Sequence, residues 1–366
     1  MQLSANKLRE QLAHMKPMLT NCSLETTRRG QNALGELMRA AHHGQVRTKR
    51  HDFAHFQGAW VLPKDLRRDG VILYLHGGGY TCGGLDYALG FGSTLADESG
   101  AKVFCAAYRL APEAPFPAAV EDALESYRYL LDKGYAPKKI CLCGESAGGG
   151  LCFSLCLKLK ELRLPLPGSV IAISPWTDLT LSGESFRTNL ERDVSLSQEQ
   201  LAFYTRCYAQ EPKSPLASPL FGDLTGLPPS LIFVGGDELL LSDSQRIYQA
   251  LRSAGSSSQL VVHPERWHAY LLYGLAEDRE DWKTVDAFLT RHLSREQKLR
   301  WMRLDNAAKI YPAALRQNWS NVFRLSATLA EEVDTKVLQS ALDVTVRRFP
   351  SLCVRLRRGL FWYYLQ

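Results

Sequence analysis

With 366 residues, 45% of them hydrophobic and 22% charged, the chain has the composition of a globular protein with room for one large domain or two. No apolar run reaches the roughly 20 residues that a membrane-spanning helix needs, and the first residues lack the apolar segment of a signal peptide. Nine cysteines, an odd number, are scattered through mostly apolar runs. We therefore expect a cytoplasmic protein whose cysteines are buried free thiols.

The net charge of +6 is uneven, because residues 297–366 carry 12 Lys and Arg against 5 Asp and Glu, whereas the rest of the chain is close to neutral. No nucleic-acid-binding motif accompanies these basic residues, so we expect no nucleic-acid partner. Cys141 and Cys143 could suggest a metal pair, but no second pair lies at ligand spacing. We expect neither a metal nor a cofactor.

Short apolar runs alternate with amphipathic segments along the chain, and this pattern predicts strands alternating with helices. The expected strands are 52–61, 70–75, 103–107, 140–143, 170–173, 231–234 and 259–263. The expected helices are two within residues 1–50, then 87–99, 118–133, 151–162, 244–254 and 282–292. Such an order is typical of an α/β fold, in which a mostly parallel sheet is covered by helices on both faces.

A Gly-x-Ser-x-Gly pentad, Gly144-Glu145-Ser146-Ala147-Gly148, stands between an expected strand and an expected helix. In that context the pentad predicts a nucleophile elbow, a turn so tight that the flanking positions have to be glycine. Ser146 is therefore the candidate nucleophile. A serine hydroxyl is a weak nucleophile, so it also needs a base and an acid that orients the base.

In folds with this elbow the chain order is serine, acid, histidine. Of the three histidines after Ser146, His268 lies in the loop that follows the last expected strand, which places it at the same sheet edge as the serine. His263 precedes a proline and His292 lies at a polar helix end, so both are weaker candidates.

Three aspartates compete for the role of the acid. Asp237 directly follows the expected strand 231–234 and is our choice. Asp243, six residues later, is the reserve, and it also suits a helix N-cap. Asp178 follows an earlier strand, where a hydrogen bond within its loop explains it equally well.

A glycine-rich turn, His76-Gly77-Gly78-Gly79, follows the expected strand 70–75. Without β-carbons, this turn allows the backbone to approach a substrate and to offer amide donors to a developing oxyanion. The expected donors are the amides of Gly78, Gly79 and Ala147. The turn lacks the Gly-Lys-Ser/Thr ending of a phosphate-binding loop and the spaced glycines of a dinucleotide turn, so those readings are disfavoured.

Several motifs occur together in the order found in one family. They are His76-Gly77-Gly78-Gly79, Tyr108-Arg109-Leu110-Ala111-Pro112-Glu113, Gly144-Glu145-Ser146-Ala147-Gly148-Gly149, Ser174-Pro175-Trp176-Thr177-Asp178 and Gly236-Asp237-Glu238-Leu239-Leu240. Together they resemble the hormone-sensitive lipase family of α/β-hydrolases over residues 50–295.

The resemblance implies an eight-stranded sheet, a helical cap made by residues 1–50 and about 179–227, and hydrolysis of carboxylic esters with short acyl chains. Glu145 departs from the aspartate that is usual in the family, which leaves the reaction intact and bears on the support of the loop. Tyr80 and Trp176 are candidates to line the pocket, although core packing explains Trp176 equally well.

Residues 297–366 form a separate segment after the hydrolase residues 51–296. An expected strand at 321–329, a helix capped by Asp334 and a hairpin about Gly359 resemble the opening of condensation and chloramphenicol-acetyltransferase-like acyltransferases. This segment contains no histidine, although those enzymes need a His-His-x-x-x-Asp-Gly motif. We expect a truncated domain without acyl-transfer activity of its own, whose aromatic run 361–364 contacts a partner or a second copy of the chain.

The hypothesis that explains most motifs is a serine carboxylesterase that hydrolyses short-to-medium acyl esters of small molecules through an acyl-enzyme. An amidase or lactonase would use the same catalytic residues. A ligand-binding module on the same fold is disfavoured because serine, acid and histidine candidates are all present. The fused C-terminal segment also raises the alternative that the hydrolase is one half of an acyl-transfer protein.

Overall fold

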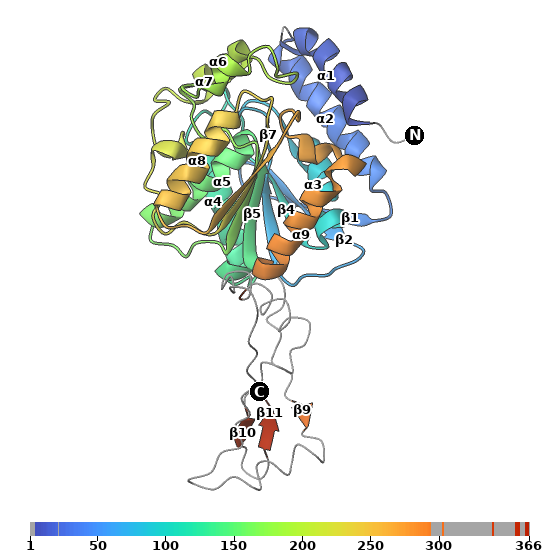
Figure 1. The fold of residues 1–366 in the computed structure, drawn as a ribbon, viewed down its shortest axis with the longest axis vertical. Helices are drawn as coiled ribbons and strands as arrows, with labels where there is room; N and C mark the ends of the chain where they lie inside the picture. Colours follow the sequence, from blue (N-terminus) through green and yellow to red (C-terminus); the bar gives the residue numbers. More distant parts are fainter. Residues whose placement is uncertain are drawn as a thin grey trace, which may run out of the picture. The chain divides into compact units, whose positions relative to one another are not determined.

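An eight-stranded sheet forms the centre of the computed structural model (Figure 1). The structure describes residues 4–20, 22–293, 302–303, 339, 356–358 and 363–365. Its strands are β1 (Val46–Asp52), β2 (Gln57–Pro63), β3 (Val71–Leu75), β4 (Lys102–Ala107), β5 (Ile140–Glu145), β6 (Ser169–Ile173), β7 (Ser230–Gly235) and β8 (Ser258–His263). They lie in the order β1-β2-β4-β3-β5-β6-β7-β8. Strand β2 runs opposite to the other seven strands, and every pair without β2 is parallel, so the expected mostly parallel sheet is confirmed.

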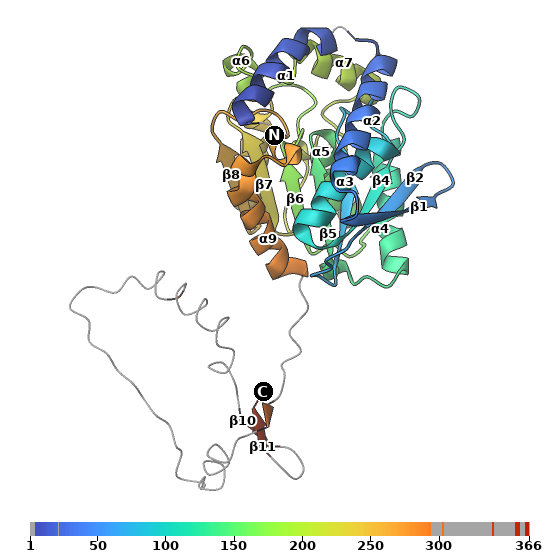
Figure 2. The same cartoon turned by 90° about the vertical axis from the view of Figure 1, so that its right-hand side faces the viewer.

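Helices cover both faces of the sheet (Figures 1 and 2). They are α3 (Leu85–Ser99) and α9 (Arg279–Leu293) on one face, and α4 (Ala118–Asp132), α5 (Ala147–Glu161) and α8 (Leu241–Ser253) on the other. Side chains of β3 alternate between the two layers: Leu73 and Leu75 enter the core with α4 and α5, whereas Ile72 and Tyr74 enter the core with α3 and α9. This two-sided burial explains why the strands are continuous apolar runs in the sequence.

The expected strand at 52–61 is confirmed only in part, because residues 57–61 lie in β2 whereas residues 53–56 form a turn. The chain instead forms a β1–β2 hairpin, in which Asp52 pairs with Gln57. The Phe53 amide donates to the Phe56 carbonyl at 2.9 Å and the two rings stack 4.2 Å apart, which closes the turn. The polar, exposed β1 carries no apolar pattern, so the sequence did not indicate it.

Four helices form a cap over the carboxyl ends of the strands (Figures 1 and 2). They are α1 (Ala5–Thr20), α2 (Leu24–Ala41), α6 (Ser185–Thr188) and α7 (Gln198–Tyr208). Helix α2 lies directly on α3. A β-carbon on Gly35 would lie 2.3 Å from the Asp86 carbonyl oxygen, and one on Gly90 would lie 2.5 Å from the Gly35 carbonyl oxygen. Two glycines therefore allow the two backbones to touch.

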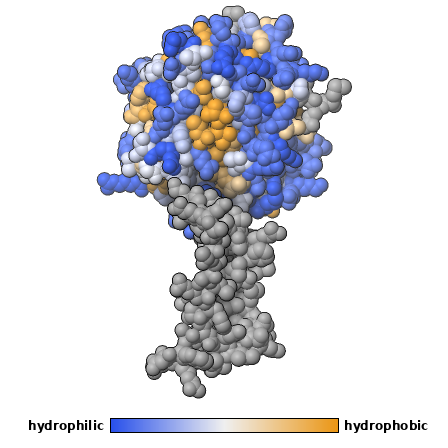
Figure 3. All heavy atoms as spheres, in the orientation of Figure 1, coloured by the Kyte–Doolittle hydropathy of each residue, from blue (hydrophilic) through white to orange (hydrophobic). Residues whose placement is uncertain are grey.

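Strand β8 is one of the two edge strands of the sheet. The space-filling view shows an apolar patch on the face of the hydrolase that is turned toward the viewer (Figure 3). Val262 on β8 is 39% exposed. Short 3₁₀ helices connect several elements: η1 (Pro137–Lys139), η2 (Pro219–Phe221), η3 (Tyr270–Tyr273) and η4 (Ala276–Asp278). None of the helices in the described part of the chain combines the length and apolar character needed to span a bilayer.

The chain separates into two compact units, residues 1–295 and 296–366. In the second unit, β9 (Met302–Arg303), β10 (Leu356–Arg358) and β11 (Tyr363–Leu365) form an antiparallel sheet in the order β10-β11-β9. The β10–β11 pair is the expected hairpin. The expected strand at 321–329 and the helix after Asp334 lie outside the described residues.

Candidate active site

Ser146 lies at the junction between β5 and α5, in the turn that the pentad predicted. Its backbone has φ 53° and ψ −124°, a conformation that L-residues rarely adopt. The Ser146 amide donates to the Ile173 carbonyl at 2.9 Å, and the Ser146 carbonyl accepts from the Trp176 amide at 2.9 Å. Hydrogen bonds to the β6 end therefore hold the strained turn in place, and the side chain remains at the carboxyl edge of the sheet.

The glycines of the pentad are required because other backbone atoms pass close to them. A β-carbon on Gly144 would lie 2.4 Å from the Gly148 carbonyl oxygen. One on Gly148 would lie 2.0 Å from the Leu75 carbonyl oxygen. Both distances are far below a van der Waals contact, so the turn closes only with glycine at these two positions.

The glycine-rich turn follows β3 and lies beside the elbow. Gly78 and Gly79 have φ values of 107° and 61°, which favour glycine. Among the described residues, neither amide donates to a protein acceptor. Ala147 is the first residue of α5, where backbone amides lack a partner within the helix. These three amides are the expected oxyanion donors, and their chemistry fits that role.

Glu145 connects the elbow to the glycine-rich turn. Its Oε1 accepts from the Gly77 amide at 2.5 Å and from the Tyr87 hydroxyl at 3.2 Å, and its Oε2 accepts from the Tyr74 hydroxyl at 2.8 Å. Burial raises the pKa of Glu145 to about 7, although these hydrogen bonds oppose the increase. Glu145, which replaces the aspartate usual in the family, thus positions Gly77 and supports the loop.

His76 supports the same turn from the buried side. Its ring stacks on Tyr108 with centroids 4.3 Å apart, and its Nδ1 donates to the Gly77 carbonyl at 2.7 Å. Burial lowers the pKa of His76 to about 4, so the imidazole remains neutral at pH 7. His76 is therefore a support for the loop and carries no charge near the serine.

His268 lies in the loop after β8, where the sequence placed it, and pairs with Glu238. The distance from His268 Nδ1 to Glu238 Oε2 is 2.6 Å. Glu238 is fully buried, and its Oε1 accepts from the Gly235 amide at 2.6 Å and from the Ser174 hydroxyl at 2.7 Å. Burial alone lowers the pKa of His268, but the hydrogen bond and charge of Glu238 raise it more, and the net pKa is above the ordinary value.

The prediction that Asp237 orients the histidine is wrong. The side chains of Asp237 and Glu238 point in different directions from one turn, and the Asp237 carboxylate pairs with Arg9, at 2.8 Å, and with Arg192. The reserve candidate, Asp243, accepts from the Thr177 and Asp178 amides, both at 2.8 Å. Glu238 was missed because a carboxylate directly before it drew the assignment, and nothing in the local pattern separates two adjacent acids in a turn.

Comparison with known proteins agrees with the fold. The family model described as an alpha/beta hydrolase fold matches residues 72–272. An acetyl-hydrolase from Streptomyces hygroscopicus is 41% identical over 64% of this chain and 80% of its own length, and an ethyl acetate hydrolase from Pseudomonas putida is 31% identical over 61% and 73%. A solved esterase from the bacterial hormone-sensitive lipase family superposes with a TM-score of 0.72 at 34% identity, over 79% of this chain and 99% of that one.

The chain belongs to the hormone-sensitive lipase family of α/β-hydrolases. It is a carboxylic ester hydrolase. In this hydrolase the N-terminal cap helix contacts the catalytic loops directly. Arg9 of α1 donates to the Glu265 carbonyl at 2.7 Å and to the Arg192 carbonyl at 3.3 Å, in addition to its ion pair with Asp237. One guanidinium thus connects the acid turn, the histidine loop and the second half of the cap.

The other candidate residues of the hydrolase have packing roles. Tyr80 is 1% exposed and stacks on Tyr208 with centroids 3.8 Å apart, and Trp176 is fully buried and donates to the Asp178 carbonyl at 3.2 Å. His292 lies in the last turn of α9. The expectation that Tyr80 and Trp176 line an open pocket is not supported by this burial.

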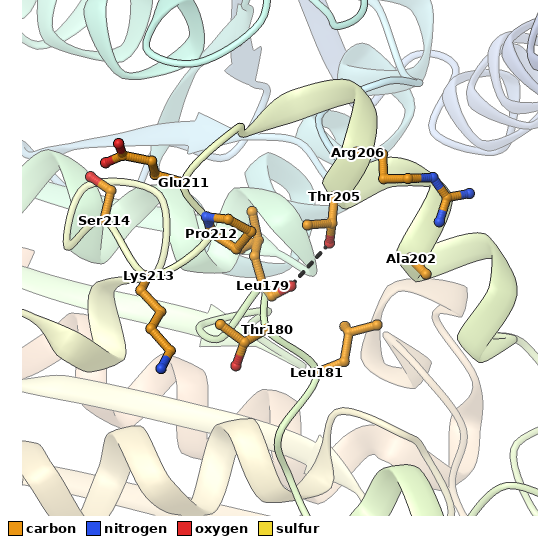
Figure 4. A pocket seen from close by; sticks show the side chains of 10 residues that line it. All are labelled: Leu179, Thr180, Leu181, Ala202, Thr205, Arg206, Glu211, Pro212, Lys213 and Ser214. Atoms are coloured by element: carbon orange, nitrogen blue, oxygen red, sulfur yellow. Dashed lines mark hydrogen bonds between the residues drawn. The ribbon is translucent and has the colours of Figure 1, made fainter.

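Two of the cavities in the described part of the hydrolase lie beside α7 of the cap. One, of about 790 Å³, is lined by Leu179, Thr180, Leu181, Ala202, Thr205, Arg206, Glu211, Pro212, Lys213 and Ser214 (Figure 4). None of these residues belongs to the elbow, the glycine-rich turn or the His268 pair. The other, of about 410 Å³, lies between the α1–α2 junction and α7 and includes Tyr204 in its wall. Tyr204 also touches the glycine-rich turn, since a β-carbon on Gly79 would lie 2.2 Å from its ring.

Proposed function

We propose that this ester hydrolase is a serine carboxylesterase for small esters with short acyl chains, in which Ser146 is the nucleophile, His268 the general base and Glu238 the orienting acid. The observation that carries the proposal is the 2.6 Å contact between His268 Nδ1 and Glu238 Oε2. Because Nδ1 donates to the carboxylate, the Nε2 lone pair is left to accept the serine proton.

The reaction follows from these roles. Ser146 Oγ attacks the ester carbonyl carbon while its proton passes to His268 Nε2, and the negative charge that develops on the carbonyl oxygen meets the amides of Gly78, Gly79 and Ala147. The imidazolium, stabilised by Glu238, returns the proton to the leaving alcohol. A water molecule then gives its proton to His268 and hydrolyses the acyl-enzyme, which releases the acid and restores Ser146.

The limited space beside the glycine-rich turn supports the preference for a short acyl chain. Tyr204 lies against Gly79, its ring is mostly buried, and its hydroxyl accepts from Gln200 Nε2 at 2.7 Å, which fixes the ring in place. Ser146 itself is only 7% exposed. A large aromatic side chain at this position leaves little room for a long chain, and the relatives named for acetyl and ethyl acetate hydrolysis are consistent with a small acyl group.

A series of p-nitrophenyl esters from two to twelve carbons tests the proposal. We expect kcat/KM to be highest between two and six carbons and at least about tenfold lower at twelve. Tyr204→Ala is expected to move the optimum to longer chains, with Phe221→Ala, an exposed aromatic side chain outside both cavities, as the matched control. A wild-type optimum at twelve carbons would contradict the short-chain assignment, and faster turnover of a matched amide or lactone would favour those activities instead.

We also propose that the hydrolase works in the reducing cytoplasm. Among the described residues, eight cysteines are free and six of them are buried. Burial raises the pKa of several of these thiols, for example Cys141 to about 12, which makes them unreactive. Cell fractionation with activity assays of each fraction checks the location, and recovery of the protein with disulfide bonds would argue against it.

A further inference from the structure

Three side chains with metal-binding chemistry meet between β8 and α9, apart from the catalytic pair. One ligand-type atom from each of His263, Asp278 and Asp281 lies within 4.8 Å of the others. Bonds of about 2.0–2.2 Å to Zn²⁺ bring ligand atoms to roughly 3.5 Å from one another, so small side-chain movements are enough to bind an ion here. The cluster combines an imidazole with two carboxylates and is more than a group of surface acids.

The outer atoms of two of these side chains already have protein partners. His263 Nδ1 donates to the Pro264 carbonyl at 3.1 Å, which leaves the Nε2 lone pair for a ligand. Asp281 Oδ2 accepts from the Tyr270 hydroxyl at 2.7 Å, and no partner is recorded for its other oxygen within the described residues. In metal sites, such outer contacts fix the orientation and the tautomer of each ligand.

Asp278 supplies the independent observation. Its side chain is fully buried, and Oδ1 pairs with Arg266 Nη2 at 2.8 Å and with Nε at 3.0 Å. Its other oxygen, Oδ2, is buried and has no hydrogen-bond partner among the described residues. A buried carboxylate oxygen without a partner is costly, and a cation beside it would remove that cost.

Charge favours a cation as well. The cluster holds two carboxylates and one guanidinium, so Arg266 balances only one of the two acidic side chains. An imidazole ligand together with carboxylates suits Zn²⁺ and its neighbours, whereas Mg²⁺ and Ca²⁺ prefer oxygen ligands throughout.

We propose that His263, Asp278 and Asp281 bind a divalent transition-metal ion of the Zn²⁺ class through one imidazole nitrogen and two carboxylate oxygens. The remaining coordination position faces solvent on the side of His263, which is the partly exposed member of the three. The ligands lie on both sides of His268 in the chain, so a bound ion fixes the loop that carries this histidine. The ion stabilises the loop and takes no part in the ester chemistry.

Binding is measured on the full chain with Co²⁺ as a spectroscopic probe and with Zn²⁺ by calorimetry and thermal unfolding. We expect one ion per chain, visible Co²⁺ bands of a nitrogen and oxygen site, and a Tm that rises with Zn²⁺ concentration. His263→Gln and Asp281→Asn are expected to weaken binding at least about tenfold. His14→Gln, which removes an exposed imidazole from α1, is the matched control and should leave binding unchanged.

Three outcomes would overturn the proposal: no stoichiometric binding, binding that His263→Gln leaves unaltered, or a thiolate-to-metal absorption band that assigns the ion to cysteines. Asp278→Asn is avoided because it also breaks the pair with Arg266. If Asp281→Asn fails to fold, the His263→Gln result decides alone, since this side chain is partly exposed and its loss leaves the buried pairs intact. None of these readouts depends on esterase activity, so they remain valid whichever ester the enzyme prefers.

Discussion

Two turns of the hydrolase invite comparison, because each follows the carboxyl end of a buried parallel strand and each contributes to the site. The elbow after β5 carries Ser146, and the acid turn after β7 carries Glu238. The elbow is specified by steric limits, because a β-carbon would lie only 2.4 Å from a backbone oxygen at Gly144 and 2.0 Å from one at Gly148. The acid turn also begins with a confined glycine, since a β-carbon on Gly235 would lie 2.4 Å from the Arg266 carbonyl oxygen, but side-chain contacts decide which of its two acids meets His268.

The difference shows which features of a site are visible in a sequence. A turn that only glycine can form leaves a pattern of glycines, so Ser146 was found directly. In the acid turn, a β-carbon on Gly236, the residue before Asp237, would make only ordinary van der Waals contacts, the nearest at 3.4 Å, so this glycine is not sterically required. The choice between Asp237 and Glu238 depends instead on distant residues, namely Arg9 for the first and Ser174 and His268 for the second.

The largest effect is expected at the elbow. Replacing Ser146 with alanine removes the nucleophile, and kcat/KM for a short p-nitrophenyl ester should fall on the order of 10⁴-fold or more. An unchanged unfolding temperature serves as the control for folding. Turnover close to that of the wild type would show that another group attacks the ester.

The acid turn is tested by a matched pair of substitutions at neighbouring positions. Glu238→Gln should reduce kcat by about 10³-fold or more, because the amide no longer stabilises the imidazolium or selects the tautomer. Asp237→Asn should cost less than about tenfold, since its carboxylate contacts arginines and not His268. Steady-state kinetics with one ester measures both, and the opposite ranking would return the catalytic role to Asp237.

A second pair compares glycines of the two turns. Gly148→Ala should destabilise the protein by more than about 3 kcal/mol, because the new methyl group meets the Leu75 carbonyl oxygen at 2.0 Å. Gly236→Ala should change stability by less than about 1 kcal/mol, since its β-carbon would meet neighbouring atoms at van der Waals distance, 3.4 Å or more. Urea unfolding of both variants checks this, and equal losses would mean that sterics do not distinguish the turns.

A smaller effect on catalysis is expected from Arg9, which contacts the acid turn from the cap. Arg9→Met should lower kcat by about three- to tenfold with KM within about twofold, because the guanidinium positions Asp237 and the Glu265 carbonyl but does not touch substrate. Arg9→Lys should recover part of the loss. A purely structural role would lower the unfolding temperature without this split between kcat and KM.

The smallest effect concerns pH. His268 has to be neutral to act as a base, and its pKa is raised above 6.5, so activity should decline as pH falls through a value above 6.5. The charge of Glu145 contributes to this increase, so Glu145→Gln should move the acid limb of the kcat/KM profile to lower pH by a few tenths of a unit. A shift to higher pH, or a flat profile from pH 5 to 8, would contradict the assignment.

Much of the fold followed from periodicity alone. Strands β3 to β8 and helices α3, α4, α5, α8 and α9 were expected within a few residues, because buried parallel strands are uninterrupted apolar runs. The hairpin β1–β2 was missed because its exposed strand is polar on both sides and closes through contacts between Phe53 and Phe56. Local pattern does not contain that information.

The same limit explains the site. His268, the glycine-rich turn and the elbow were placed correctly because chain order and glycine content restrict them. The partner of His268 was assigned one residue too early. The two adjacent acids are distinguished only by the tertiary contacts of Asp237 with two arginines of the cap, Arg9 and Arg192. Ser174 was noted only as part of a motif, and its contact with Glu238 at 2.7 Å required the three-dimensional structure.

The close approach of α2 to α3 has a consequence for protein engineering. The first half of the cap touches the body backbone to backbone through Gly35 and Gly90, which limits any exchange of the cap with that of a relative. A transplanted α2 with any larger residue at position 35 would be held away from α3 and would carry α1 with it. A successful chimera therefore has to keep both glycines, or to retain residues 1–41 of this chain so that α2 is not exchanged.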